Sequence, residues 1–302
     1  MSADLSAGAG PALDRPGSAG NDRGAGRARP GLRGSLAVSE LLTLFRRRRT
    51  QAILGVLAGV PLLIAVAVKL SSDDGRGGRG PALVDRLSQN GLFVGVTALV
   101  VSIPLFVPVA IGVVAGDTIA GEANLGTLRY LLVAPAGRTR LLVVKYLGAA
   151  AFCVVAPLTV VVVGALIGAA LFDVGPVPLL SGDTVSVPES IIRALLVAAY
   201  VAVSMLGLSA VGLFVSTLTE IPVGAMAATV TLAITSQILD ALPQVEWLHP
   251  YLLSHHWLDL GDLLRTPIGW ESFGANAVLQ AGYVAVFGAL AWARLTTRDV
   301  LS

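Results

Sequence analysis

The charged side chains between residues 116 and 145 are the part of this sequence whose types and spacing best suit a chemical task. Asp117 and Glu122 fall in the early turns of a predicted helix, where carboxylates suit the positive end of the helix dipole. Arg129 and Arg138 follow, and their guanidinium groups can form bidentate, charge-assisted hydrogen bonds with carboxylates of another protein. Charges of both signs favour a docking role in which Glu122 faces the partner. The alternative is an ordinary loop on the positively charged side of a membrane.

Motifs for catalysis and for nucleotide binding are absent from the sequence. A P-loop needs GxxxxGK[ST], because its glycine amides and its lysine surround the phosphates. The two lysines, Lys69 and Lys145, each follow a valine instead. The net charge of +2 is too small to indicate a nucleic-acid partner. We therefore predict no catalytic and no cofactor-binding residues, and we expect that the chain is not an enzyme.

His255, His256 and Asp259 are the side chains most typical of a metal ligand set. Imidazole and carboxylate groups at helical spacing can share one ion. The alternative is a solvated external surface, and the sequence favours this alternative. We therefore predict no metal site.

The composition places all these residues in a membrane protein. Of 302 residues, 55% are hydrophobic and 13% are charged, and the mean hydropathy is +0.79. A soluble domain carries about 25% charged residues, so this chain has too few to cover a surface in water. Its apolar runs are long enough to cross a bilayer, which takes about 20 residues of helix. The predicted fold class is an all-α integral membrane protein.

Six uncharged apolar segments are predicted to span the membrane. They lie at about 51–69, 92–115, 146–172, 194–218, 222–239 and 276–293. Pro61, Pro104, Pro108 and Pro157 fall inside them and predict kinks, which a helix bundle tolerates. Carriers driven by an ion gradient usually hold ionisable residues within the membrane, and the cores of these spans have none. The sequence therefore favours a partner that supplies the energy.

Small and polar residues inside the spans indicate how the helices pack. The GxxxG spacing, which allows close approach of two helices, occurs at Gly55/Gly59, Gly112/Gly116 and Gly164/Gly168. Five polar side chains interrupt the apolar sequence of the fifth and sixth spans: Thr231, Thr235, Gln237, Asn276 and Gln280. These five residues either line a candidate translocation path or hydrogen-bond between helices.

The segments outside the spans differ in character. Residues 1–34 are rich in Gly and Pro without apolar periodicity, which predicts a disordered cytoplasmic tail. Residues 35–50 place apolar side chains on one helical face and end in Arg46–Arg49, which predicts an interfacial helix. Alternatively, this arginine run is only a topological anchor. Residues 240–275 carry three tryptophans and three prolines, which predict short external helices at the membrane surface.

The distribution of basic residues predicts the orientation. Fifteen of the 21 lysines and arginines fall on the side of the N-terminus, and six fall on the other side. Basic residues accumulate in cytoplasmic segments. We therefore expect a multi-pass protein of the inner (plasma) membrane of the cell, with the N and C termini both cytoplasmic.

Residues 116–148 resemble the first cytoplasmic loop in the membrane subunits of ABC-2 type (type V) ABC exporters. That loop has an acid after the second span, then Ile, Glu, Gly-Thr-Leu-Arg, Leu-Leu, Pro and Arg, and a Lys before the third span. The matching residues are Asp117, Ile119, Glu122, Gly126, Thr127, Leu128, Arg129, Leu131, Leu132, Pro135, Arg138 and Lys145. The interfacial helix and the external helices are similar too, so the resemblance covers 35–302 as one transmembrane domain. The layout looks most similar to stand-alone permeases that pair with a separate ATPase.

The resemblance implies a function and a set of partners. In the family, a coupling helix between spans two and three fits a groove of the ATPase. The residues implied in this ATPase coupling are Asp117, Ile119, Glu122, Gly126, Thr127, Leu128, Arg129 and Arg138. Two copies of a separate ABC ATPase subunit would bind ATP and Mg, and a second permease would complete a homodimer or a related heterodimer. The chain would then form the translocation path of a hydrophobic or amphipathic substrate.

Two other functions stay open. An ATP-independent membrane carrier or scaffold would be indicated by an intramembrane ionisable residue or an inverted repeat, and neither is visible in the sequence. A sensor or immunity subunit of an ABC complex has no sequence signature that separates it from an exporter.

Overall fold

The computed structural model describes residues 40–73, 91, 93–125, 137–173, 175, 177–178 and 184–297. The predicted tail at 1–34 and the first part of the predicted helix at 35–50 lie outside these ranges. Residues 40–46 are helical and are followed by a bend at Arg47, after which the first long helix begins.

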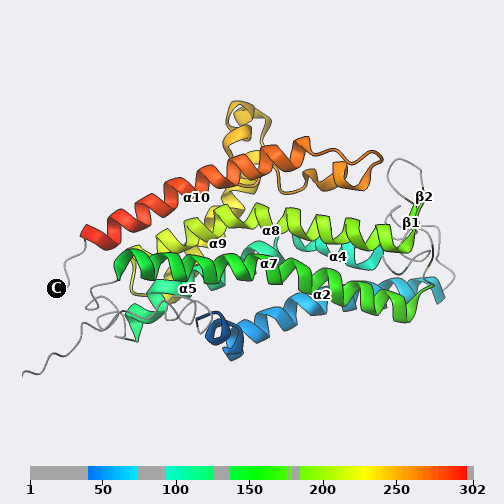
Figure 1. The fold of residues 1–302 in the computed structure, drawn as a ribbon, viewed down its shortest axis with the longest axis horizontal. Helices are drawn as coiled ribbons and strands as arrows, with labels where there is room; N and C mark the ends of the chain where they lie inside the picture. Colours follow the sequence, from blue (N-terminus) through cyan, green and yellow to red (C-terminus); the bar gives the residue numbers. More distant parts are fainter. Residues whose placement is uncertain are drawn as a thin grey trace, which may run out of the picture.

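The α-helices run side by side and form a bundle (Figure 1). They are α2 (Arg48–Asp73), α4 (Phe93–Ser102), α5 (Phe106–Asn124), α7 (Arg138–Leu171), α8 (Val187–Leu218), α9 (Pro222–Asp240) and α10 (Glu271–Thr297). Within the described ranges, six of them, all except α4, are long and apolar enough to cross a membrane. The prediction of six spans is therefore confirmed at the level of helix length and composition.

Short elements connect the helices at one end of the bundle and beside it. The strands β1 (Val177–Pro178) and β2 (Thr184–Val185) pair antiparallel between α7 and α8, which is a small departure from an all-helical chain. Between α9 and α10 lie two 3-10 helices, η1 (Pro243–Tyr251) and η2 (Asp259–Leu264). Short helices between the fifth and sixth spans were expected here.

The second predicted span, 92–115, is two helices and not one. α4 ends at Ser102, the chain turns at residues 103–105, and α5 begins at Phe106. Pro104 lies in this turn and has no N–H to continue the hydrogen-bond ladder of α4. The side chain of Gln237 on α9 donates to the carbonyl oxygen of Pro104 at 2.9 Å. A neighbouring helix thus satisfies the backbone group that the break leaves free.

Several spans extend further than the apolar sequence predicts, α7 and α8 among them. α7 begins at Arg138 and α8 at Val187, where the expected starts were 146 and 194. At 1.5 Å per residue, the 34 residues of α7 extend for about 51 Å, and the hydrocarbon core is only about 30 Å thick. The charged N-terminal turns of α7 therefore project beyond the apolar layer as helix.

α8 forms the centre of the bundle and α10 lies at its edge. Other parts of the chain bury 67% of the most apolar stretch of α8, but only 11% of that of α10. The main core gathers large side chains from α2, α4, α5, α7 and α8, with Tyr200, Phe152 and Met205 fully buried. α10 keeps most of its apolar face available to lipid or to another protein.

Glycines allow α4 and α7 to touch along their backbones. A Cβ atom on Gly164 would lie 2.5 Å from the Cα of Gly95, which is closer than packed atoms come. Gly168 meets the backbone of Gly91 in the same way. The predicted close approach therefore occurs at Gly164/Gly168. A close approach also occurs at Gly112/Gly116, which packs against α9. It does not occur at Gly55/Gly59, where a Cβ atom would have nothing within 4 Å among the described residues.

Candidate functional site

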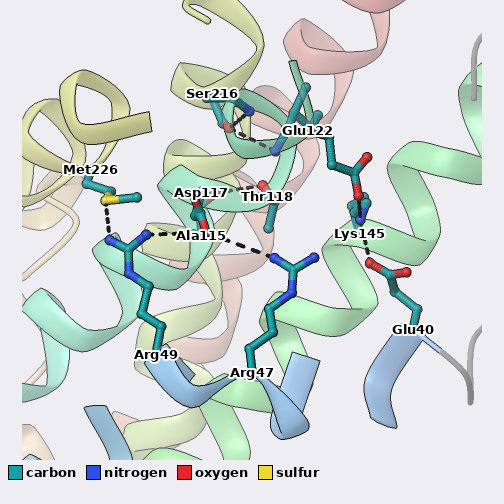
Figure 2. A network of polar contacts seen from close by, with 12 residues as sticks. Glu40, Arg47, Arg49, Ala115, Asp117, Thr118, Glu122, Lys145, Ser216 and Met226 are labelled. Atoms are coloured by element: carbon teal, nitrogen blue, oxygen red, sulfur yellow. Dashed lines mark hydrogen bonds and ion pairs between the residues drawn. The ribbon is translucent and has the colours of Figure 1, made fainter. Parts of the chain in front are cut away.

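A network of charged and polar side chains occupies one end of the bundle, where α5 ends and α7 begins (Figure 2). Residues 40–46, the first turn of α2, and parts of α8 and α9 contribute to it. These segments are far apart in the sequence, and the network joins them at one level of the bundle.

Lys145 on α7 lies at the centre of one half of the network. Its side chain is only 6% exposed, and its ammonium group pairs with the carboxylates of Glu40 and Glu122. Moving a single charge out of water is costly unless a charge of opposite sign accompanies it. Two carboxylates around one ammonium group meet this requirement. The pairing also joins the helix at 40–46, the end of α5 and the start of α7.

Asp117 on α5 is the centre of the other half. Its Oδ2 lies 3.4 Å from a guanidinium nitrogen of Arg49 and 4.0 Å from one of Arg47. Another nitrogen of Arg49 donates to the sulfur of Met226 on α9 at 2.7 Å. Asp117 thus holds the first turn of α2 against α5, and Arg49 continues the link to α9.

α8 joins the same end of α5 through a neutral contact. The hydroxyl oxygen of Ser216 accepts the backbone N–H groups of Ile119 and Ala120, at 3.0 and 2.8 Å. The side chain of Ile119 is 1% exposed and packs in an apolar cluster with Leu213 of α8 and with residues of α7 and α10. The last turns of α5 are therefore fixed by both polar and apolar contacts.

Arg138 holds the C-terminal end of α10. Its Nη1 donates to the carbonyl oxygens of Leu295 and Thr296, at 3.0 and 2.8 Å. The final carbonyls of a helix have no partner inside the helix, and a cation at this end is favourable. The indole N–H of Trp292 donates to the hydroxyl of Thr139 at 3.0 Å and adds a second link between α7 and α10.

A small cavity lies between the two halves of the network. It has a volume of about 40 Å³, and Arg47, Asp117 and Lys145 are among its lining residues. Roughly 10–15 Å³ is enough for one water molecule where polar partners are present. The cavity therefore has room for water beside these charged side chains.

The structure brings four of the predicted coupling residues to this end of the bundle: Asp117, Ile119, Glu122 and Arg138. The other four, Gly126, Thr127, Leu128 and Arg129, lie outside the described residues. Asp117, Ile119 and Glu122 lie on α5 itself, so these three residues belong to the end of a spanning helix and not to a separate short helix. The carboxylate of Glu122 faces Lys145, and its side chain is 15% exposed.

Sequence reasoning missed several members of the network. Glu40 was assigned no role, Arg47 and Arg49 were interpreted as part of an interfacial helix or anchor, and Ser216 and Met226 were not considered. One signal was available: Lys145 is one of only two lysines, and it directly precedes an apolar span. A lysine in that position needs a carboxylate partner, but the sequence does not show which one.

The five candidate path residues are not brought together. Asn276 and Gln280 on α10 are buried and hydrogen-bond to other segments, Asn276 to the hydroxyl of Ser204 at 2.7 Å and Gln280 to the carbonyl of Leu253 at 3.1 Å. Gln237 contacts the break before α5, as described above. Thr231 and Thr235 are exposed on the outer surface of α9.

His255 and His256, between α9 and α10, pair with separate carboxylates. Nδ1 of His255 lies 2.8 Å from Asp240, and Nδ1 of His256 lies 2.8 Å from Asp259. Across the residues that the structure describes, no group of three or more His, Cys, Asp or Glu side chains is arranged to hold a metal ion.

The bundle of spanning helices and its charged end define a multi-pass helical membrane protein. A family model described as "ABC-2 family transporter protein" matches residues 39–236. The chain therefore belongs to the ABC-2 transporter family, as the resemblance in the loop after the second span predicted. The matched region contains every residue of the network from Glu40 to Met226. A comparison with curated proteins finds no match.

Proposed function

We propose that this chain is the permease subunit of an ATP-driven exporter and that a separate ATPase subunit supplies the energy. Family membership and six apolar spanning helices support a membrane component of a transporter. The sequence has no P-loop, so hydrolysis is assigned to a partner. By this proposal two ATPase copies bind ATP and Mg, and two permeases, identical or related, enclose the path.

The observation that carries the coupling proposal is the network at the end of α5. Asp117 ties this end to α2, Glu122 and Lys145 tie it to α7 and to residues 40–46, and Ser216 ties it to α8. A displacement imposed on the connection between α5 and α7 is therefore shared by several helices at once. Interfaces of this kind switch between discrete arrangements more readily than they deform continuously.

The path is proposed to suit a hydrophobic or amphipathic substrate. Among the described spanning helices, only α5 has a charged residue in its middle part, Asp117, which is paired with Arg47 and Arg49; the other charged residues lie nearer the helix ends. A route between such helices has no unpaired fixed charge that would select a small ion. In this scheme, closure of the ATPase dimer changes the side of the membrane to which the path opens.

The experiment that tests this function is purification of the tagged chain from its own membranes in a mild detergent. Mass spectrometry of the eluate is expected to find a P-loop protein in stoichiometric amount, and the eluate is expected to hydrolyse ATP. An unrelated polytopic protein with the same tag serves as the control. Recovery of the chain alone, under conditions that preserve a known membrane complex, would overturn the proposal in favour of a carrier or scaffold.

A further inference from the structure

An apolar groove runs between α2 and α5 on the surface of the bundle. Its volume is about 410 Å³, which is within the usual range of about 300–1,000 Å³ for ligand sites. On α2 the groove is lined at positions 49, 52, 53, 56 and 57, which share one helical face. Val56, Leu105 and Phe106 in its walls are 62%, 48% and 39% exposed. The groove is thus open to the apolar layer around the bundle.

One end of this groove is positively charged. Arg49 lines it there, and its side chain remains 49% exposed although Asp117 lies 3.4 Å away. Arg46 and Arg48, its near neighbours in the chain, are exposed and make no ion pair within the described part of the chain. Only two of the four successive arginines pair with Asp117, so the run leaves an excess of positive charge at this end.

The length of the groove matches half of a bilayer. From Arg49 to Leu57 the helix rises about 12 Å, and one leaflet of the hydrocarbon core is about 15 Å thick. The groove ends at Leu105 and Phe106, where α5 begins after the break at Pro104. It therefore starts at the level of the headgroups and ends inside the apolar layer.

We propose that this groove binds one anionic phospholipid of the leaflet on the arginine side. An acyl chain lies between α2 and α5, and the phosphate accepts hydrogen bonds from Arg49. Arg46 and Arg48 add electrostatic attraction, since a basic residue near an anionic membrane surface strengthens binding by about fivefold. Guanidinium groups match the geometry of phosphate oxygens well. The proposal requires only that the chain lies in a membrane and does not depend on the coupling scheme above.

A second copy of the chain fits the groove less well than a lipid does. Most homodimers have two-fold symmetry, and in a membrane the two-fold axis lies along the membrane normal. Each residue of one copy then contacts residues that lie at the same depth of the membrane in the other copy. A contact centred on this groove would bring the arginine run of one copy against that of the other, which is unfavourable.

The test is native mass spectrometry of the purified protein, taken from vesicles with equal amounts of phosphatidylglycerol and phosphatidylcholine. The wild-type chain is expected to retain phosphatidylglycerol at least about fivefold over phosphatidylcholine. Arg49→Gln is expected to lower this ratio by about fivefold, because it removes one basic residue and the hydrogen bonds to the phosphate, whereas Arg46 and Arg48 remain. Ala52→Trp, which fills the groove from the exposed face of α2, is expected to abolish retention of the lipid.

Matched variants on the same helix serve as controls. Lys69→Gln removes a cation at the opposite end of α2, and Leu63→Trp adds an indole outside the groove, at a residue that is 71% exposed. Both are expected to retain the lipid as the wild type does, and an excess of inorganic phosphate is expected to leave it bound. Equal retention of the two lipids by the wild type would overturn the proposal. So would an unchanged ratio in Arg49→Gln, or an Ala52→Trp variant that loses dimer contacts but keeps the lipid.

Discussion

Lys145 has the strongest electrostatic constraints of the residues in the network, because its buried ammonium group depends on Glu40 and Glu122. Breaking a buried ion pair by removing one partner typically costs about 3–5 kcal/mol. Glu40 is 32% exposed, so water screens part of this pair. The contribution of Lys145 therefore belongs at the lower end of that range.

We expect Lys145→Met to lower the free energy of unfolding by about 3 kcal/mol, because the variant keeps the length of the side chain and leaves two carboxylates without their cation. Thermal unfolding of the purified protein in detergent measures this loss as a lower Tm. Lys69→Met, at an exposed position on α2, is the control and should change the Tm little. An equal decrease of the Tm in both variants would mean that the ion pairs of Lys145 do not contribute to the free energy of unfolding.

At this scale the sequence grouped charged residues that lie at one end of the bundle, but it did not identify what they contact. Asp117, Glu122 and Arg138 were selected from their types and spacing, and all three lie at one end of the bundle. Their partners lie as many as 158 residues away in the chain, as Thr296 does from Arg138. A partner at that separation is decided by how the helices pack, which no local pattern contains.

At the scale of helices, the apolar periodicity gave the number and the order of the spans but not their ends. α7 begins at Arg138, earlier than expected, because the helical backbone hydrogen bonds continue through the charged residues. The hydropathy of the sequence places the start of the span only after the last charged residue, Lys145. The proline pattern predicted a kink at Pro104, and the structure has a complete break there. Gln237 on another helix donates to the carbonyl oxygen that this break leaves free, and the sequence does not show that contact.

The close contact of α4 with α7 gives a prediction at the same scale. Gly164→Ala would place a Cβ atom 2.5 Å from the Cα of Gly95, so the two helices must separate. Overpacking of this kind typically costs about 1–3 kcal/mol. We expect a correspondingly lower free energy of unfolding and a lower yield of folded protein, measured by chemical denaturation and by size-exclusion chromatography.

Gly55→Ala is the matched control for that experiment. Gly55 belongs to the same kind of GxxxG spacing, but a Cβ atom there has nothing within 4 Å. Alanine is favoured over glycine inside a helix by about 0.5–1 kcal/mol, so this variant should be neutral or slightly stabilised. If Gly164→Ala is as stable as Gly55→Ala, the backbone contact between α4 and α7 is not as described.

For the whole molecule, the excess of basic residues at one end predicts the orientation in the membrane. Asn124, at the end of α5, and Thr184, in β2, are exposed near opposite ends of the bundle. A membrane-impermeant maleimide should label Thr184→Cys on intact cells and Asn124→Cys only after lysis. Cys153 is buried and should give little background. Labelling of Asn124→Cys on intact cells would reverse the orientation.

The central claim is that an ATPase subunit docks at the end of the bundle where α5 meets α7. The most direct measurement is photo-cross-linking in native membranes, with a benzophenone amino acid placed at Asn124 in one variant and at Thr184 in the other. The account predicts a cross-link from position 124 to a protein with a P-loop, and none from position 184. A cross-link from position 184 to such a protein, or its absence from position 124, would contradict the account.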